Sequence, residues 1–221
     1  MSLNKRQGWG EKRSQAFAQT KNRGAGGVYS ALARKIARQW VSRDGSPTIL
    51  ELGSGPGLLA VELKKLLPNA RIIVTDPSEP MLGIARRNAD EANFPDIETV
   101  PGTAENIAVD AAALDMVISQ QSLHEFSDLE QAFSEIQRVL KSGGKVIITD
   151  WNKSCPTWKF HLWNLRMLRQ MGWRRANEAR YSYRRARRCD DVSRLLRQSN
   201  LIPTETQERD AGFFVAASKS E

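Results

Sequence analysis

The chain has 221 residues, 33 Lys and Arg against 25 Asp and Glu, and 40% hydrophobic content. These values exclude a disordered chain and fit one globular domain with an inserted subdomain. No apolar run approaches the roughly 18 residues of a membrane span, and the polar start at 1–6 predicts no signal peptide. The two cysteines, Cys155 and Cys189, are far apart in sequence and the chain has only two histidines, which predicts free thiols in a cytoplasmic protein and no metal site.

Residues 1–28 are polar, basic and glycine-rich, which predicts a flexible arm ahead of a domain spanning 29–221. A helix is expected from Tyr29 to Val41, where apolar residues recur at helical spacing. Short apolar runs then alternate with amphipathic stretches. Strands are expected at 48–52, 71–75, 97–101, 114–119 and 145–149, and helices at 57–67, 79–92, 104–108 (short) and 128–140. This alternation implies parallel crossovers and a doubly wound three-layer α/β/α sandwich, with its ligand at the carboxyl ends of the strands.

The alternation ends at residues 151–190, which contain four tryptophans. A helix is expected over 157–171, and 151–190 is interpreted as a helical cap insertion. A helix at 190–199 and strands at 201–207 and 212–218 follow. Asp210-Ala211-Gly212 between these strands predicts a hairpin, and therefore an antiparallel edge strand.

The charge is uneven along the chain. Residues 1–43 hold ten basic residues and one acid (net +9), and residues 44–150 hold eight basic and seventeen acidic residues (net −9). Residues 151–190 hold eleven basic and two acidic residues (net +9). If the two basic segments meet in space, their field favours an anionic substrate. The alternative is that they are solvated surface, and the composition leaves both interpretations open.

The most informative stretch is Ile49–Gly57, with the sequence ILELGSGPG. An apolar strand ends near Glu51, glycines follow at 53, 55 and 57, and a helical pattern starts at once. A glycine turn between strand and helix is typical of nucleotide binding, because glycine lets the backbone approach a ligand. A dinucleotide turn (G-x-G-x-x-G) requires glycine where Leu58 stands, which argues against an NAD-dependent dehydrogenase. A P-loop is excluded, because no Gly-Lys-Ser/Thr closes the turn.

Asp76 is the second signal, 19 residues after Gly57 at the end of the second expected strand. A carboxylate at this place can accept hydrogen bonds from both hydroxyls of a ribose. The alternative is a capping or turn aspartate at the start of the next helix, which also suits Asp76-Pro77-Ser78. The glycine turn beside it favours the ribose interpretation.

Together these features resemble the class I S-adenosylmethionine-dependent methyltransferases, in the branch typical of ubiquinone and menaquinone biosynthesis. The resemblance covers 48–150 and rests on five stretches: ELGSGPG at 51–57, DPSEPML at 76–82, GTAEN at 102–106, SLHEF at 122–126 and RVLKSGG at 138–144. It implies a Rossmann-like, seven-stranded, mostly parallel sheet in the order 3-2-1-4-5-7-6, with strand 7 antiparallel. It also implies S-adenosylmethionine as the cofactor.

The resemblance assigns expected roles on the methionine and ribose side of that cofactor. Glu51 would orient the turn and reach the methionyl ammonium. Asp76 would accept from the ribose hydroxyls, and Ser119 and Gln120 would lie beside the methionine arm and the sulfonium. The turn itself would bring backbone beside the aminoacyl part and the ribose through Gly53, Ser54, Gly55 and Gly57.

On the adenine side, Pro77 or Met81 would pack on the ring, and plain helix core is the alternative for Met81. Ala104 would offer its backbone N–H to adenine. Thr103 stands where the family often has Asp, so it brings no charge to the adenine amino group, and Glu105 is the alternative partner.

His124 is the candidate general base, for an acceptor that must lose a proton, because it follows the fourth strand and histidine suits proton transfer near neutral pH. Its alternative is a contact with the cofactor or the rim of the cleft. Asp150 and Tyr29 rank below it. His161 is expected on the surface or between tryptophans.

The expected reaction is methyl transfer from S-adenosylmethionine to a small, anionic or aromatic acceptor. The alternative is an RNA methyltransferase that uses the basic arm and the Arg- and Trp-rich cap. Contact of residues 184–188 with anionic lipid, and cofactor binding without catalysis, are further alternatives. The sequence leaves the acceptor and the oligomeric state undetermined.

Overall fold

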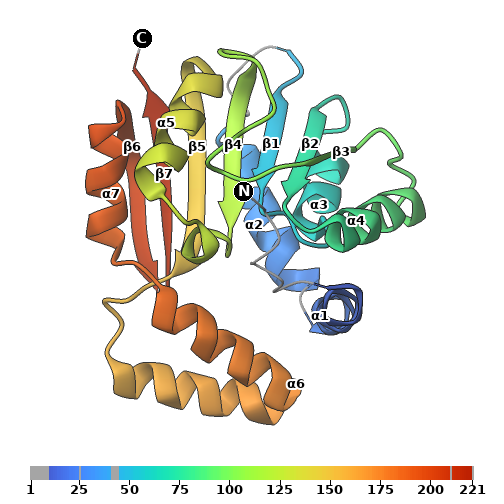
Figure 1. Cartoon of the computed structure of the whole chain (residues 1–221), viewed down its shortest axis with the longest axis vertical. Helices are drawn as coiled ribbons and strands as arrows, with labels where there is room; N and C mark the ends of the chain where they lie inside the picture. Colours follow the sequence, from blue (N-terminus) through green and yellow to red (C-terminus); the bar gives the residue numbers. More distant parts are fainter. Residues whose placement is uncertain (1–9, 25, 41–44, 210, 221) are drawn as a thin grey trace, which may run out of the picture.

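A seven-stranded sheet forms the middle layer of the computed structural model, which describes residues 10–24, 26–40, 45–209 and 211–220 (Figure 1). Its strands are β1 (Thr48–Leu52), β2 (Arg71–Asp76), β3 (Glu98–Pro101), β4 (Leu114–Gln120), β5 (Leu140–Trp151), β6 (Leu201–Arg209) and β7 (Gly212–Lys219). The spatial order is β3-β2-β1-β4-β5-β7-β6. The first five strands pair in parallel, and β7 is antiparallel to both β5 and β6. The predicted sheet order and direction are confirmed.

Helices cover both faces of this sheet (Figure 1). One face carries α2 (Gly26–Arg38), α3 (Leu58–Leu66) and α4 (Glu79–Glu91), and the other carries α5 (Leu129–Val139) and α7 (Cys189–Gln198). Neighbouring strand residues alternate between the two layers, since Ile49 packs in the first core and Leu50 in the second. The three-layer sandwich is therefore confirmed, and its inner strands β1, β2 and β4 are buried on both faces as a parallel sheet requires.

Two local expectations in the 100–150 region are wrong. Residues 104–108 form a turn with a bridge between Thr103 and Asn106, not a helix. In addition, β5 begins at Leu140, directly after α5 ends at Val139, and not at residue 145 as expected. The pairing of β4 with β5 shifts register between Leu114 and Met116, so the extra residues of β5 lie in an irregular part of the ladder.

Arg138 stabilises the non-helical turn at 104–108. Its guanidinium donates to the carbonyls of Ile107 (2.9 Å) and Val109 (3.0 Å), and it pairs with Glu135 at 2.7 Å. Glu135 in turn accepts from the N–H of Ile107 at 3.0 Å. Side chains of α5 thus satisfy backbone groups that would otherwise need helical partners. The RVLKSGG stretch therefore has a structural role in holding the loop after β3.

We expect Arg138→Ala to lower the free energy of unfolding by about 2 kcal/mol, because it leaves half-buried carbonyls without a donor. Glu135→Gln should cost less, roughly 1 kcal/mol at neutral pH. The Arg138 hydrogen bond holds the pKa of Glu135 below its usual range. The carboxylate's contribution is therefore present above the unfolded-state pKa of about 4.3 and is lost as pH falls through the lower folded-state pKa. Urea unfolding at neutral and acidic pH measures this, with exposed Glu130→Gln on the same helix as control.

The N-terminal segment differs from the predicted flexible arm at 1–28. Residues Glu11–Gly24 form helix α1, and α2 begins at Gly26, so residue 28 is inside a helix. Phe17 and Ala18 of α1 pack against Met81 and Ile84 of α4. In the sequence, Phe17 and Ala18 alone are too weak a periodic signal to predict a helix. In the folded chain they contact the apolar side chains of α4. Residues 1–9 of the expected arm lie outside the described residues.

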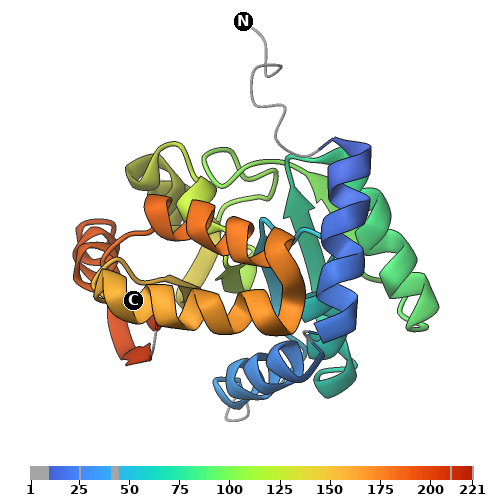
Figure 2. The ribbon, with the colours of Figure 1, turned by 90° about the horizontal axis from the view of Figure 1, so that it is seen from below.

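The cap contains one long element, α6 (Thr157–Arg185), which is broken at Gly172 (φ 83°). Its two arms, 157–171 and 173–185, lie side by side across the end of the molecule, as seen from below in Figure 2. Asn164 joins them, since its Nδ2 donates to Ala176 O at 2.8 Å and its Oδ1 accepts from Arg180 Nε at 2.9 Å. Phe160 stacks on Tyr183 with ring centroids 3.9 Å apart. The expected cap is a helical hairpin, longer than the helix predicted at 157–171.

None of the helices among the described residues combines the length and apolar character that a membrane crossing requires.

Candidate functional site

The parallel strands end at one edge of the sheet, and α6 lies across that edge (Figures 1 and 2). The glycine turn follows β1, Asp76 ends β2, Ser119 and Gln120 end β4, and Asp150 is near the end of β5. The fold thus brings together residues that are up to a hundred positions apart in the sequence. This is the edge at which doubly wound sheets bind ligands.

The turn is tied to β2 by backbone hydrogen bonds. Ser54 N donates to Thr75 O at 3.0 Å, and Gly55 N donates to Asp76 Oδ2 at 2.9 Å. Gly53, Gly55 and Gly57 all have positive φ, at 62°, 54° and 68°. The turn therefore depends on glycine for its backbone conformation, as the sequence predicts.

The three glycines differ in what surrounds them. A Cβ on Gly53 would lie 2.5 Å from Ser122 Cβ, and one on Gly57 would lie 2.9 Å from Ala85 Cβ. A Cβ on Gly55 would meet no atom within 4 Å. Gly53 and Gly57 therefore serve close packing inside the protein. Gly55 is the position where backbone faces open space that a ligand can approach.

These surroundings give a matched pair of substitutions. Gly53→Ala should lower the free energy of unfolding by about 2–4 kcal/mol, since it adds a steric clash to the left-handed backbone. Gly55→Ala has the same backbone cost without the clash, so about 1 kcal/mol is expected. Urea denaturation of both variants measures the difference. Equal losses would contradict the assignment of Gly53 to packing and Gly55 to open space.

Asp76 has a buried carboxylate that is held in place by backbone donors. Oδ1 accepts from Ser78 N at 2.8 Å and Oδ2 accepts from Gly55 N. Burial raises the pKa of Asp76, while these two N–H groups act in the opposite direction. The helix cap of α4 is Ser78, whose Oγ accepts from Met81 N. The capping interpretation of Asp76 is therefore wrong, whereas its interpretation as a turn aspartate is correct. Both carboxylate oxygens keep lone pairs that can accept from further donors.

Glu51 adds a second buried acid near this edge, with only 2% of its surface exposed. Burial raises the pKa of the Tyr29 hydroxyl, and the Glu51 carboxylate raises it further, while the positive charge of Arg175 opposes both. Two buried acids beside the turn disfavour a pyrophosphate and favour a ligand with hydroxyl, ammonium or sulfonium groups.

On the adenine side, the structure separates the candidates. Pro77 is exposed, whereas Met81 is buried in the contact between α1 and α4. Ala104 is buried in the core beside Ile107, and Thr103 is half-buried in its bridge with Asn106. Pro77 is therefore the more accessible of the two candidates for packing on a flat ring.

Glu105 holds the backbone just before the next helix, α5, whose cap is Asp128. Its Oε1 accepts from the backbone N–H groups of Ser127 and Asp128 and from the Ser127 hydroxyl. These bonds hold the pKa of Glu105 below its usual range, against the opposing effect of burial. The structure thus gives Glu105 a structural partner in place of the free carboxylate that the adenine role assumes.

Ser122 links the ends of β1 and β4. Its hydroxyl donates to Leu52 O at 2.8 Å and therefore accepts from Ser119 Oγ, also at 2.8 Å. It also packs against Gly53. Gln120 is half-buried at the end of β4. Ser122 was not singled out from the sequence, although the SLHEF stretch contained the signal.

His124 and Asp150 form a buried pair at this edge. His124 lies in the short 3₁₀ helix η2 (Leu123–Glu125), and its Nδ1 is 2.9 Å from Asp150 Oδ1. Asp150 Oδ2 also accepts from the backbone N–H of His124 at 3.0 Å. An ionised carboxylate can only accept, so Nδ1 carries a proton. Nε2 lies 3.8 Å from Glu125 Oε1 and has a lone pair when the ring is neutral. Sequence reasoning named both residues but not their pairing.

Two arginines of the cap reach toward the site. Arg185 Nε donates to His124 O at 3.1 Å, and its Nη2 is 3.7 Å from Glu125 Oε2. The Arg175 side chain is 14% exposed and pairs with Glu178 at 3.2 Å. Its Nε is buried without a hydrogen-bond partner, and its guanidinium lies 5.7 Å from the Phe17 ring centroid. Composition marked the basic cap, but it could not show which arginines point inward.

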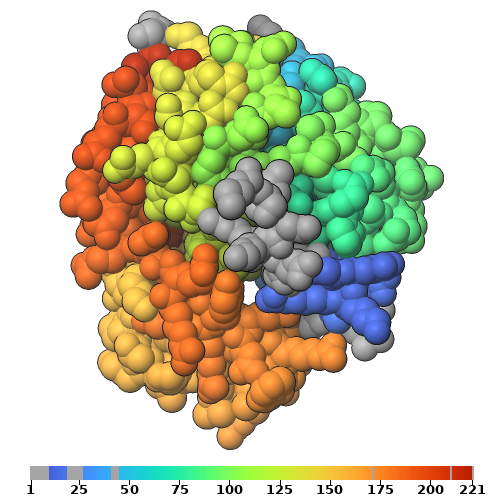
Figure 3. Space-filling model, in the orientation of Figure 1, coloured from blue at the N-terminus to red at the C-terminus, as the bar shows by residue number. Residues whose placement is uncertain are grey.

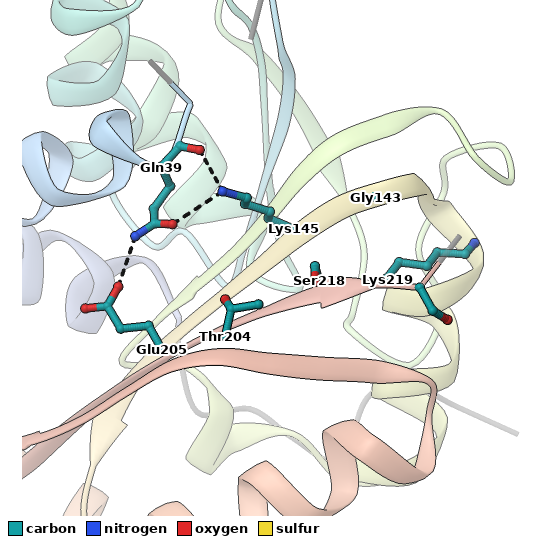
Figure 4. Close-up of a pocket in the computed structure, with 8 residues that line it drawn as sticks. Gln39, Gly143, Lys145, Thr204, Glu205, Ser218 and Lys219 are labelled. Atoms are coloured by element: carbon teal, nitrogen blue, oxygen red, sulfur yellow. Dashed lines mark hydrogen bonds between the residues drawn. The ribbon is translucent and has the colours of Figure 1, made fainter. Parts of the chain in front are cut away.

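An opening separates part of α6 from α1 in the space-filling view (Figure 3). A different cavity, of about 620 Å³, lies where β5 begins and β7 ends, which is the opposite edge of the sheet (Figure 4). Its polar groups are paired within the protein, since Lys145 Nζ donates to Gln39 O at 2.8 Å and Gln39 Nε2 donates to Glu205 Oε2 at 3.0 Å. That network stabilises the packing of α2 on the sheet and is remote from the glycine turn. Within the described residues, no three His, Cys, Asp or Glu side chains group as metal ligands would.

Comparison with known proteins agrees with this arrangement. Residues 50–148 match the family model of the methyltransferase domain. The chain is 33% identical over 127 residues to demethylmenaquinone methyltransferase of Chlorobaculum tepidum, covering 58% of this chain and 50% of that protein. It is 35% identical over 103 residues to the Thermus thermophilus protein of the same name, covering 47% and 46%. The chain thus spans about half the length of these curated relatives.

A solved structure matches the whole chain. A putative S-adenosylmethionine-dependent methyltransferase from Methanococcus maripaludis superposes with a TM-score of 0.77 at 27% identity. The match covers 100% of this chain and 98% of that one, so it includes the cap as well as the sheet.

Proposed function

We propose that this chain, which belongs to the class I S-adenosylmethionine-dependent methyltransferases, transfers a methyl group to a small acceptor with an acidic hydroxyl on an aromatic ring. The observation that carries this proposal is the buried His124–Asp150 pair, 2.9 Å apart, at the strand edge that also holds the glycine turn and Asp76. A cofactor-binding edge and a proton acceptor are thus present in one site.

The residues at this edge fit S-adenosylmethionine. Gly55 faces open space, and Asp76 offers carboxylate lone pairs for hydroxyl donors. The Glu51 acid suits an ammonium or sulfonium. When bound, the cofactor supplies an electrophilic methyl group. We assign Pro77 to the adenine ring, with the backbone at Thr103 and Ala104 nearby, and Ser119 and Gln120 to the methionine side.

The protein's part in the reaction is orientation and proton transfer. The acceptor gains a methyl carbon and gives up its hydroxyl or ring proton, which His124 receives at Nε2. Asp150 holds the imidazole in the required tautomer and stabilises the positive charge that develops on it. The buried position of both side chains strengthens this interaction, because water screens it less.

The acceptor class follows from the cap side of the site. Arg175 places a positive charge near Tyr29, and Tyr29 is close enough to Glu51 to feel its charge. A cation at this side favours an acceptor with a negatively polarised oxygen. The names of the curated relatives, which include demethylmenaquinone methyltransferases, support a quinone-type ring.

RNA is the alternative acceptor, and the exposed arginines of the cap favour it. Labelled methyl transfer decides between them. The chain is incubated with labelled S-adenosylmethionine and a cell extract, which is then separated into solvent-extractable small molecules, aqueous metabolites and RNA. We expect label in the small-molecule fractions, and label at least about 10²-fold slower to appear with a His124→Gln variant as control. Label confined to RNA would favour the alternative. Binding of S-adenosylhomocysteine without transfer to any fraction would indicate a cofactor-binding protein.

A further inference from the structure

The first arm of α6, residues 157–171, has two apolar sides. Its inner side, with Phe160, Trp163 and Met167, packs in a cluster with Trp151 at the end of β5. Its outer side carries Trp158 (61% exposed), Leu162 (61%) and Leu165 (46%). Spacings of four and three residues place these three on one helical face. The inner side accounts for the folding of the hairpin, and the outer side is left without a structural role.

Exposed apolar surface concentrates on this element. Five of the eight large hydrophobic side chains that are exposed among the described residues lie on α6, and the other two of these five are Trp173 (70%) and Tyr181 (45%). Scattered exposed hydrophobics are normal on a protein surface, but such a concentration on one element marks an interaction surface.

The charge around this surface is strongly positive. The exposed basic residues of α6 are Lys159, Arg166, Arg169, Arg174, Arg180, Arg184 and Arg185. Glu178 is the only acid in the α6 sequence, and it is paired with Arg175. Large apolar side chains among an excess of positive charge are typical of helices that lie in the interface of an anionic membrane.

We propose that the outer face of the α6 hairpin docks on the surface of an anionic lipid bilayer. Trp158, Leu162 and Leu165 enter the boundary between headgroups and acyl chains, and the flanking arginines pair with headgroup phosphates. The hairpin lies across the strand edge that holds the candidate site (Figure 2). Docking therefore brings that site next to the bilayer, and it goes beyond the proposed methyl transfer without depending on it.

The choice of lipid over RNA rests on the side chains at the centre of the face. Aromatic rings and arginines serve both partners, but Leu162 and Leu165 give a nucleic acid neither stacking nor hydrogen bonds. Buried in acyl chains, the same leucines contribute in proportion to their apolar area.

Vesicle sedimentation of the full chain tests this proposal. The probes are phosphatidylcholine vesicles and vesicles with about one-third phosphatidylglycerol, where each nearby basic residue adds about 1 kcal/mol, or roughly fivefold in partition. We expect the chain to bind the anionic vesicles, with a blue shift of tryptophan fluorescence, and to be released by high salt. Equal binding to both vesicle types, or to neither, would overturn the proposal.

Variants distinguish binding through this face from non-specific binding to vesicles. Leu162→Ser with Leu165→Ser should weaken partition by at least about tenfold, and Arg166→Gln with Arg169→Gln by roughly 25-fold. The controls are Leu66→Ser and Ile202→Ser, which remove exposed apolar side chains outside α6 and should leave partition unchanged. Unaltered vesicle binding by both of the α6 double variants would contradict the proposal. Salt-sensitive binding of bulk tRNA without vesicle binding would contradict it as well. Titration with S-adenosylhomocysteine verifies that each variant is folded, and it keeps a failure of docking distinct from a failure of the cofactor site.

Discussion

Asp76→Asn is expected to weaken the binding of S-adenosylhomocysteine by roughly 100-fold, which is the loss of about 3 kcal/mol from two charge-assisted hydrogen bonds. Asp76 Oδ1 and Oδ2 each already accept one backbone N–H, and each retains a lone pair for a ribose hydroxyl. An asparagine amide has one accepting oxygen, and its nitrogen would face the N–H of Gly55 or Ser78. The change removes the acceptor and disturbs the turn at once.

Calorimetric titration measures this effect, and Asp96→Asn is the matched control. Asp96 also carries a paired carboxylate, at 2.6 Å from Lys64 Nζ, but its side chain is 62% exposed and far from the turn in the fold. We expect that variant to bind with unchanged affinity. If Asp76→Asn also binds like the unaltered chain while thermal melting shows both are folded, Asp76 has no part in the cofactor site.

The same carboxylate predicts a pH dependence. Burial raises the pKa of Asp76 above that of an exposed aspartate. Binding requires the charged form, so affinity should fall as pH drops through this raised value, at a higher pH than an exposed aspartate would produce. Affinity that is constant down to about pH 4 would contradict a contact between Asp76 and the ligand.

The parts of the fold that depend on local patterns of apolar residues were predictable from the sequence. Strands such as 48–52 are apolar on both faces and separated by helical stretches, which indicates a parallel sheet under two layers of helices. The order of the strands is not local information, and it came from the resemblance. Helix α1 escaped prediction because Phe17 and Ala18 gain stability only against Met81 and Ile84, which are distant in the sequence. The break at Gly172 escaped because a single glycine is also tolerated inside a straight helix.

The site was predictable as a set of backbone positions rather than as a set of contacts. Glycine spacing identified the turn, because positive φ restricts the residue type. Motif similarity could not tell whether a side chain faces a ligand or a neighbouring element. Met81 and Glu105 illustrate this, since the first packs against α1 and the second binds the backbone just before α5. Arg175 and Arg185 are the opposite case, since the sequence did not single them out although they reach toward the site. The kink of α6 decides which arginines of this basic segment turn inward.

His124→Gln is expected to lower the rate of methyl transfer by about 10²- to 10⁴-fold, the usual contribution of a positioned general base. Glutamine keeps a polar group of similar length that can donate to Asp150, but it has no nitrogen that takes a proton near neutral pH. Affinity for S-adenosylhomocysteine should stay within about twofold, since the proposed role of His124 is on the acceptor rather than on the cofactor. The measurement is labelled methyl incorporation beside calorimetry on the same preparation.

Asp150→Asn distinguishes a base held in one tautomer from a histidine that only packs. The Asp150 carboxylate accepts from Nδ1, from the His124 backbone and from Trp151 N at 2.6 Å. Asparagine allows the imidazole to present Nε2–H to the acceptor, so the rate should fall although the ring stays in place. If the two residues act as one unit, adding Asp150→Asn to His124→Gln should lower the rate little further. Additive losses of rate in the double variant would mean that Asp150 acts independently of His124. A loss of cofactor affinity in His124→Gln would instead assign the histidine to cofactor binding rather than to proton transfer.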